Sequence, residues 1–197
     1  MSRTATSKAT KGQILKAASD LFLEGGAKAL SVRAIATKAG VSTIGIYSHF
    51  QGKQGILDAL YIEGFEKIAA ALDVAPDTLS PHDAILETAR AYLETAESNK
   101  AHYRLIFGDF GEDFSPSQEA KETGAQAFNA LVRRVSTFLE GETETRCKEA
   151  ALQLWALVHG FVSLKLHSVG EPVDVANWRN LVIEAVKTHI RSLKTTS

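Results

Sequence analysis

The side chains best suited to chemistry lie in one short segment, residues 42–53. Thr43, Tyr47 and His49 offer hydroxyl and imidazole groups to a partner. Lys53 adds a positive charge, and the segment contains no acidic residue. Groups of this kind hydrogen-bond to phosphates and to the edges of bases. The segment therefore indicates contact with a nucleic acid rather than bond-breaking chemistry.

Groups that could serve a catalytic or metal site are scattered. The single cysteine, Cys147, excludes an intrachain disulfide and favours a reducing, cytoplasmic location. A lone cysteine is more often a small buried side chain than a nucleophile. No histidine falls into a metal-binding spacing, whether His49, His82, His102, His159, His167 or His189. Glycine-rich phosphate loops and nucleophile elbows are also missing. We therefore predict no enzyme, cofactor or metal; His159 with a distant acid is the remaining enzymatic alternative.

Apolar periodicity and helix breakers place this segment in an all-α chain. Ile14, Ala18 and Phe22 share one helical stripe, and Gly25 and Gly26 end it. Residues up to about Ala9 are expected to form a disordered basic arm. About nine helices are predicted in total, over residues 10–24, 32–39, 43–50, 53–72, 82–97, 100–110, 117–139, 143–169 and 175–193.

Residues 36–41 predict a tight turn between two short helices. Ala36 is small where the helices must approach, and Gly40 accepts the positive φ that the turn requires. Val41, Ile46 and Phe50 can anchor the second helix from behind. This arrangement is a helix-turn-helix, with the remaining side chains of the second helix facing outward.

The outward face suits the major groove of double-stranded DNA. Ile44 can contact a thymine methyl group, and Gly45 lets the backbone approach the bases. Hydroxyl, aromatic and basic groups around it can contact phosphates. The predicted DNA-contacting residues are Ser31, Arg33, Ser42, Thr43, Ile44, Gly45, Tyr47, His49 and Lys53.

The charge distribution agrees with this interpretation. The whole chain has a net charge of −1, but residues 1–53 contain eight Lys or Arg against two Asp or Glu, which is +6. The remaining residues carry −7. A basic N-terminal part on an acidic body favours a polyanionic partner, although a solvated basic surface is the alternative.

Residues 14–50 resemble the N-terminal domain of the tetracycline-repressor (TetR-like) family. The matching stretches are Ile14–Ala18, Leu21–Gly26, Ser31–Ala36, Ala39–Ser42 and Ile46–Phe50. The resemblance implies a homodimer of nine-helix chains, with a DNA-binding domain over 1–53 and a ligand-binding and dimerisation domain over 54–197. Ile44 and Gly45 depart from the family's usual residues, so the operator preference cannot be copied from relatives.

The segment Ala150–Leu166 is apolar almost all the way round. Such a helix must be covered on more than one side, and a second subunit would supply the outer cover. The central helix of a monomer is the alternative. The predicted dimer contacts on this helix and the last one are Leu157, Phe161, Leu164, Trp178, Val182 and Val186.

Trp155, His159 and Gly160 resemble the WHG subgroup of TetR-like C-terminal domains. That resemblance implies a small-molecule pocket, although each aromatic side chain of this kind is more often plain core than a ligand contact. The predicted ligand contacts are Tyr103, Phe107, Phe110, Phe128, Trp155 and His159.

Together these features predict a ligand-responsive transcriptional repressor. It would bind a pseudo-palindromic operator as a homodimer and leave it when a small-molecule effector binds. The residues do not separate a repressor from an activator. A helix bundle that no longer binds DNA is disfavoured by Tyr47, His49 and Lys53. No segment approaches the ~20 apolar residues of a membrane span, so no membrane partner is expected.

Overall fold

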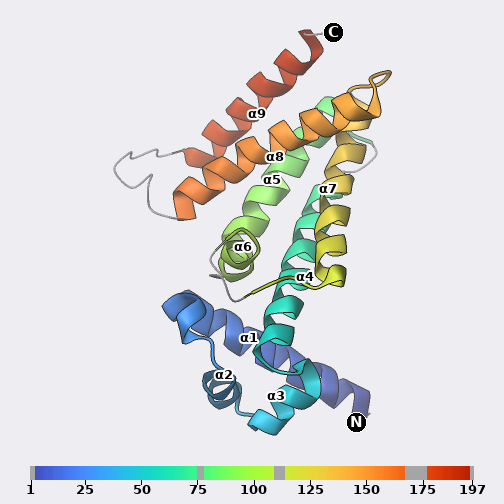
Figure 1. Cartoon of the computed structure of the whole chain (residues 1–197). Coiled ribbons are helices and arrows are strands. Elements are labelled where there is room, and N and C mark those ends of the chain that lie inside the picture. The colour runs from blue at the N-terminus through green and yellow to red at the C-terminus, as the bar shows by residue number, and fades with distance from the viewer. Residues whose placement is uncertain (1–2, 75–77, 109–113, 167–176, 196–197) are drawn as a thin grey trace. The chain divides into compact units, whose positions relative to one another are not determined.

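The computed structural model describes residues 3–74, 78–108, 114–166 and 177–195. These residues form nine helices and no strand, which confirms the predicted all-α class (Figure 1). The helices are α1 (Arg3–Ala29), α2 (Val32–Ala39), α3 (Thr43–Phe50), α4 (Lys53–Leu72), α5 (Pro81–Ser98), α6 (Lys100–Ile106), α7 (Gln118–Phe138), α8 (Glu144–Leu166) and α9 (Trp178–Thr195).

The chain forms two compact units. Unit 1 comprises Met1–Phe65 and Asn99–Gly124, and unit 2 comprises Glu66–Ser98 and Ala125–Ser197. Helices α4 and α7 each contribute residues to both units. The functional division at residue 53 stays a prediction, because compactness does not tell which residues bind DNA.

Unit 1 is organised around α1. Ile14, Ala18 and Phe22 are completely buried, as their shared stripe predicts. Helix α6 lies against α1, where the Arg104 guanidinium stands 5.8 Å from the centroid of the Phe22 ring. Helix α6 also approaches α4 closely, since a Cβ added at Gly64 would stand 3.0 Å from Cγ2 of Ile106. Unit 1 thus holds α6 against α1 and α4, the helices that flank the helix-turn-helix in the chain.

The sequence predicts the end of α1 correctly but not its beginning. The expected disordered arm up to Ala9 is wrong, because the helix already begins at Arg3. Extending an existing helix fixes one residue per hydrogen bond, so a nucleated helix propagates through an Ala- and Lys-containing segment. The predicted break is confirmed: Gly25 and Gly26 leave helical geometry, with φ values of −145° and 64°.

Unit 2 is built on contacts among α5, α8 and α9. Helix α8 buries one face, which includes Leu154, Val158 and Val162. Helix α9 buries a stripe with helical spacing, made of Val182, Val186, Ile190 and Leu193. These stripes form the core of unit 2.

Two helix ends differ from the prediction. Helix α6 ends at Ile106 rather than near Phe110, and Gly108 follows with a φ of 143°, outside helical geometry. The predicted extension of α8 to Val169 and the start of α9 at Val175 lie outside the described residues. None of the described helices combines the length and apolarity needed to cross a membrane.

Candidate nucleic-acid interface and internal cavity

Two serine caps start the helices of the helix-turn-helix. Oγ of Ser31 accepts a hydrogen bond from the Ala34 N–H at 3.1 Å, and Oγ of Ser42 accepts one from the Gly45 N–H at 3.0 Å. Both serines have extended backbones, the usual conformation of an N-cap. Both side chains therefore define where the short helices begin, in addition to their predicted role toward DNA.

The turn between α2 and α3 depends on Gly40. Its φ and ψ are 67° and 31°, the left-handed conformation, in which a Cβ costs about 1–2 kcal/mol. The Gly40 N–H donates to the Thr37 oxygen at 3.2 Å, and the Val41 N–H donates to the Ala36 oxygen at 3.0 Å. These bonds close α2 and redirect the chain into α3. The predicted need for positive φ at Gly40 is confirmed.

Helix α3 has a buried back and an exposed apolar front. Ile46 and Phe50 are buried, whereas Ile44 is 79% exposed and Tyr47 is 57% exposed. Because Ile44 and Tyr47 are three residues apart, they lie on the same face of the helix and form a patch rather than scattered apolar residues. Thr43 shares the exposed side, and Gly45 and His49 are half-buried. The helix thus presents a methyl-rich, hydroxyl-bearing surface to a partner.

The remaining predicted DNA contacts flank this surface with different exposure. Arg33 on α2 is exposed, and Lys53 at the start of α4 is half-buried. Lys38, also on α2, forms an ion pair with Glu24 of α1. Lys11 was not predicted, but its Nζ lies 5.9 Å from the centroid of the Phe50 ring. Lys11 thereby adds an exposed positive charge beside the end of α3.

Close backbone approach joins α3 to α4. Gln51 and Gly52 both have positive φ, 60° and 115°. A Cβ added at Gly55 would stand 1.8 Å from the backbone oxygen of Phe50, far inside any real contact. Sequence reasoning missed Gly55. The available signal was the pair Gly52 and Gly55, which follows the anchoring Phe50 with only two residues between the glycines.

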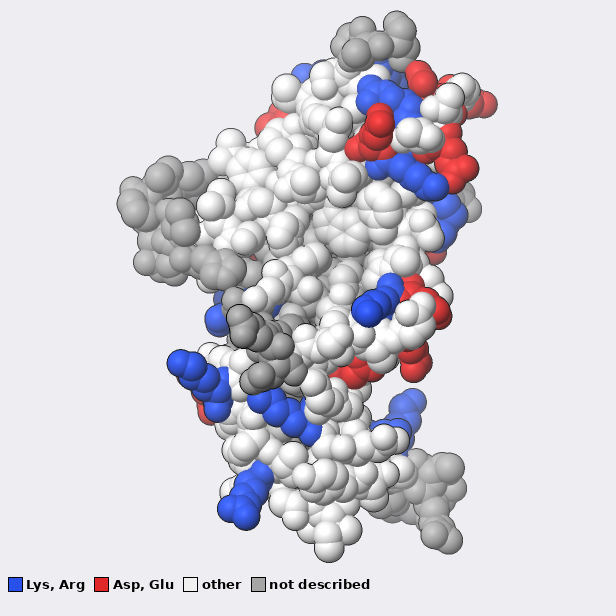
Figure 2. Space-filling model, in the orientation of Figure 1, with Lys and Arg blue, Asp and Glu red and all other residues white. Residues whose placement is uncertain are grey.

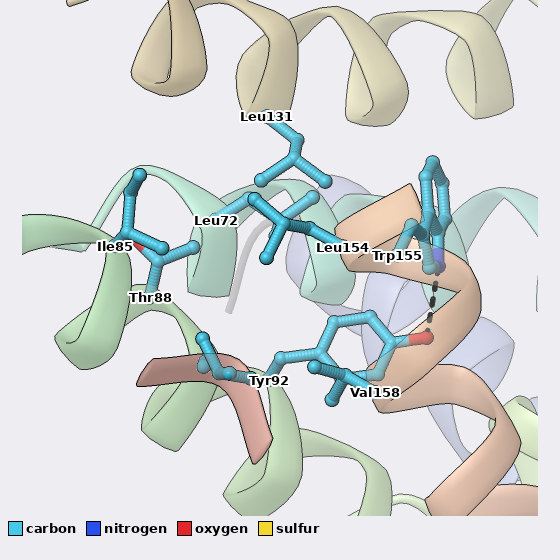
Figure 3. Close-up of a pocket in the computed structure, with 10 residues that line it drawn as sticks. Leu72, Ile85, Thr88, Tyr92, Leu131, Leu154, Trp155 and Val158 are labelled. Carbon is cyan, nitrogen blue, oxygen red and sulfur yellow. Dashed lines mark hydrogen bonds between the residues drawn. The ribbon is translucent and has the colours of Figure 1, made fainter. Parts of the chain in front are cut away.

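Unit 2 contains a cavity of about 30 Å³ (Figure 3). It is lined by ten residues from α4, α5, α7, α8 and α9: Leu72, Ile85, Thr88, Ala89, Tyr92, Leu131, Leu154, Trp155, Val158 and Val186. Two of these residues are hydrogen-bonded to each other, since the Trp155 Nε1–H donates to the Tyr92 hydroxyl oxygen at 3.0 Å. Thr88 is 2% exposed, and its Oγ1 has no hydrogen-bond partner among the described residues.

The structure does not bring the six predicted ligand contacts together. Trp155 lines the cavity, and Phe128 stacks on it with ring centroids 5.5 Å apart. Tyr103 and Phe107 belong instead to unit 1, where their ring centroids lie 4.8 Å apart. Aromatic side chains fill either core equally well, so residue type alone could not assign them to a unit.

The two other predicted ligand contacts do not line the cavity. His159 is absent from its wall and half-buried, and burial lowers its pKa below the ordinary value, so the imidazole is neutral at pH 7. Phe110 lies outside the described residues.

Sequence reasoning missed the part of the cavity wall that α5 supplies. Ile85, Thr88, Ala89 and Tyr92 follow the i, i+3, i+4, i+7 spacing of one helix face. A threonine and a tyrosine inside such an otherwise apolar stripe were the available signal.

Helix α8 leaves its second face uncovered in the single chain. Leu152, Ala156 and Leu164 are exposed, and a Cβ added at Gly160 would meet nothing within 4 Å. Figure 2 shows a broad surface without charged side chains over α8. Leu181 at the start of α9 is also exposed. These residues are called the apolar α8 face below.

The predicted dimer contacts divide between this face and the core. Leu164 is exposed, and Leu157, Phe161 and Trp178 are half-buried. Val182 and Val186 are completely buried in unit 2, so the structure corrects their placement in an interface. A stripe of apolar residues shows which side of a helix is buried, but not whether its own chain or a partner covers it.

A cluster centred on Glu97 ties α5 to α8 and α9. Its carboxylate accepts hydrogen bonds from Lys165 Nζ at 2.8 Å, Trp178 Nε1 at 3.1 Å and Arg179 Nε at 3.0 Å. Burial raises the pKa of Glu97, but hydrogen bonds from Arg179, Lys165 and Trp178 outweigh it and lower the pKa from 4.5 to about 2. Glu97 is therefore ionised at every ordinary pH.

The described residues contain no group of three or more His, Cys, Asp or Glu arranged to hold a metal ion. The functional features of the described residues are thus an exposed helix-turn-helix in unit 1, an apolar cavity in unit 2 and an apolar face on α8.

Comparison with known proteins assigns these features to a family. Residues 14–60 match the family described as "Bacterial regulatory proteins, tetR family". Residues 85–185 match the family described as "Tetracyclin repressor-like, C-terminal domain". The finer resemblance to the WHG subgroup stays a prediction.

Individual relatives agree with the family matches. The uncharacterized HTH-type transcriptional regulator Rv0681 of Mycobacterium tuberculosis is 27% identical over 172 residues, 85% of this chain and 75% of the relative. The HTH-type transcriptional repressor KstR2 of M. tuberculosis is 31% identical over 101 residues, 50% of each protein. A protein of unknown function from Rhodococcus sp. RHA1 has a similar solved structure, with a TM-score of 0.77, 26% identity, and coverage of 93% of this chain and 94% of that one.

The matches agree with the fold and exclude the enzymatic alternative, because the matched family and the relatives named for their role regulate transcription. The helix-turn-helix and the larger helical part each have a counterpart among these matches. The chain belongs to the tetR family of bacterial regulatory proteins, which are DNA-binding regulators of transcription.

Proposed function

We propose that this regulator is a repressor that binds a pseudo-palindromic operator as a homodimer and releases it when a small molecule occupies the cavity of unit 2. The observation that carries the proposal is the front of α3, where Ile44 and Tyr47 are left largely exposed on a helix that is firmly anchored from behind. An exposed apolar surface of this kind is removed from water when the helix enters the major groove of DNA.

On this proposal α3 is the reading helix. Ile44 contacts a thymine methyl, Thr43 hydrogen-bonds to a base or phosphate, and Gly45 allows close backbone approach. Tyr47 joins His49, Lys53 and Arg33 in contacting phosphates. Ser31 and Ser42 each accept one backbone N–H, and each hydroxyl still has a hydrogen to donate to a phosphate.

The apolar α8 face supports the homodimer. Exposed leucines on α8 and α9 would be removed from water if two copies met through these helices, forming a four-helix interface. A two-fold arrangement would present two copies of α3 to half-sites about one helical turn of DNA apart. This symmetry is the reason to expect a pseudo-palindromic operator.

Because α5 and α6 are consecutive in the chain, a movement of α5 at the cavity can be passed on toward the reading helix. Helix α5 supplies four cavity residues and ends at Ser98, and α6 begins at Lys100. Helix α6 in turn contacts α1 and closely approaches Gly64 of α4. A ligand that shifts α5 would therefore move α6 and bias the helix-turn-helix, which is the coupling that release requires.

The test is selection of bound fragments from the source genome, followed by footprinting on the best fragment. A two-fold symmetric footprint and an affinity that falls steeply with salt are expected. A protein that stays monomeric and binds no fragment above background contradicts the proposal. A reporter under the selected operator decides the direction of regulation, since loss of the regulator raises transcription from a repressed promoter and lowers it from an activated one.

A further inference from the structure

We infer that the effector is a compact, uncharged, largely apolar molecule with one hydrogen-bonding group, and that Thr88 recognises this group. The inference rests on the proposed function, because it takes the cavity of unit 2 as the effector site. It goes beyond that function by naming the chemistry of the ligand and the side chain that selects it.

The wall of the cavity excludes a charged ligand. None of its ten residues is Asp, Glu, Lys, Arg or His, and seven of them are Ala, Val, Leu or Ile (Figure 3). An ion placed here would lose its hydration and meet no opposite charge, which is strongly unfavourable. The cavity of about 30 Å³ also favours a compact ligand: it holds about two water-sized groups, and a ligand the size of one ring enters only as the wall opens around it.

Thr88 carries a buried hydroxyl that makes no hydrogen bond to the described part of the protein. Helical threonines on the surface donate to a carbonyl four residues earlier, as Thr137 does to Arg133 at 3.2 Å and Thr188 to Glu184 at 2.9 Å. The Thr88 hydroxyl is nine-tenths buried or more and makes no such bond within the described chain. Buried hydroxyls without a partner are rare, and each calls for an explanation.

The other polar atoms of the wall have partners. The Trp155 Nε1–H is used by the Tyr92 hydroxyl, as the dashed line in Figure 3 shows. Thr88 is therefore the lining group that gains most from a ligand oxygen or nitrogen, and it can serve as donor or acceptor. A neutral molecule with one such atom satisfies the hydroxyl while its apolar part contacts the aliphatic wall.

The experiment uses three probes of similar size on the full-length protein: phenol, toluene and benzoate. Isothermal titration calorimetry measures their binding to the wild-type protein and to Thr88→Val, which keeps the shape but removes the hydroxyl. We expect phenol and toluene to bind and benzoate to bind at least tenfold more weakly. In Thr88→Val, phenol affinity should fall about tenfold while toluene affinity stays within twofold.

Two further variants locate the binding. Thr137→Val is the matched control, because its hydroxyl is exposed and bonded within its own helix; it should leave all three affinities unchanged. Ala89→Leu adds volume to the wall and should abolish both phenol and toluene binding, provided that circular dichroism shows a folded protein. If that variant does not fold, the ratio of phenol to toluene affinity in Thr88→Val still decides the role of Thr88.

The inference is overturned if benzoate binds as tightly as phenol, if no probe binds, or if Thr88→Val affects phenol and toluene equally. Adding phenol to the complex of the protein with the selected operator tests the ligand class and the proposed function separately. Phenol that binds the cavity without weakening operator binding supports the ligand class but contradicts release by an effector. Operator binding without any probe binding supports DNA recognition and contradicts the ligand class.

Discussion

At the scale of single residues, the glycines around α3 have opposite environments. A Cβ at Gly55 would overlap the Phe50 backbone oxygen, whereas a Cβ at Gly45 would stand 3.5 Å from Ser42 Oγ, an ordinary contact. Gly55 is therefore required by packing. Gly45 is not required by the fold, and its absent side chain leaves room for close approach to DNA.

Gly55→Ala is expected to destabilise the protein by about 1–3 kcal/mol, because the backbone of α3 or α4 must shift. Gly45→Ala, the matched control, should raise stability by about 0.4–1 kcal/mol through the lower entropy of the unfolded chain. Urea unfolding followed by circular dichroism measures both. Equal stability of the two variants would show that the α3–α4 contact is looser than described.

Tyr47 and Ile44 differ in the kind of DNA contact that we expect. Tyr47→Ala should weaken binding to all sequences by a similar factor, about tenfold, because phosphate contacts carry no sequence information. Ile44→Ala should reduce the preference for the selected operator, because a methyl contact is lost. Fluorescence anisotropy with operator and scrambled DNA measures both effects.

Uracil in place of thymine tests the Ile44 contact directly, since it removes only the methyl group. The wild-type protein should lose affinity at one or two positions, and Ile44→Ala should lose none there. Equal losses in both proteins would place the Ile44 side chain away from the thymines.

At the scale of helices, the Glu97 cluster holds together elements that are distant in sequence. Lys165 belongs to the end of α8, and Trp178 and Arg179 begin α9. The Lys165 ammonium also lies 4.7 Å from the centroid of the Trp178 ring. One carboxylate on α5 thus anchors both helix ends in unit 2.

The cluster predicts a specific loss of stability in acid. Because the folded pKa of Glu97 is about 2 and its ordinary value is 4.5, the stabilisation is fully present above pH 4.5 and is lost as the pH falls toward 2. Its size is on the order of 1–3 kcal/mol. Urea unfolding between pH 6 and 2.5 should show a steeper acid loss for the wild-type protein than for Glu97→Gln.

Glu184→Gln is the control for this measurement. Glu184 is an exposed carboxylate that pairs with Lys187 on its own helix, and hydrogen bonding to Lys187 lowers its pKa. Its removal should change the acid loss much less than removal of Glu97. Parallel curves for wild type and Glu97→Gln would mean that the cluster contributes nothing to folding.

At the scale of the whole molecule, the apolar α8 face should decide the oligomeric state. Leu152 is 61% exposed in the single chain. Leu152→Glu would place a charge on the proposed interface, where the dimer would remove it from water without giving it a partner. We expect analytical ultracentrifugation to give a dimer for the wild type and a 21.3 kDa monomer for the variant.

The matched control is Leu23→Glu, which changes an exposed leucine of α1 in unit 1. It should leave the protein dimeric. Operator affinity should fall at least tenfold in Leu152→Glu, because two linked reading helices bind more tightly than one. A wild-type protein that sediments as a monomer, or a dimeric Leu152→Glu, would contradict the interface.

Local chemistry made much of the fold predictable from the sequence. Ser31 and Ser42 cap helices, and Gly40 takes a left-handed conformation that its neighbours cannot adopt cheaply. These effects act over three or four residues, so the bounds of α2 and α3 and the exposed front of α3 follow from the sequence. The N-terminal arm was the local error, because propagation of α1 back to Arg3 depends on an existing helix.

Only the tertiary structure decided which residues far apart in the chain contact one another. Sequence placed Val182 and Val186 on an apolar stripe, but only packing showed that unit 2 covers them and leaves Leu181 exposed. Tyr92 meets Trp155, and Glu97 meets Arg179, across many intervening residues. Helical periodicity states that a face must be buried; the three-dimensional arrangement of helices determines what buries it and where, as at Thr88, a cavity remains.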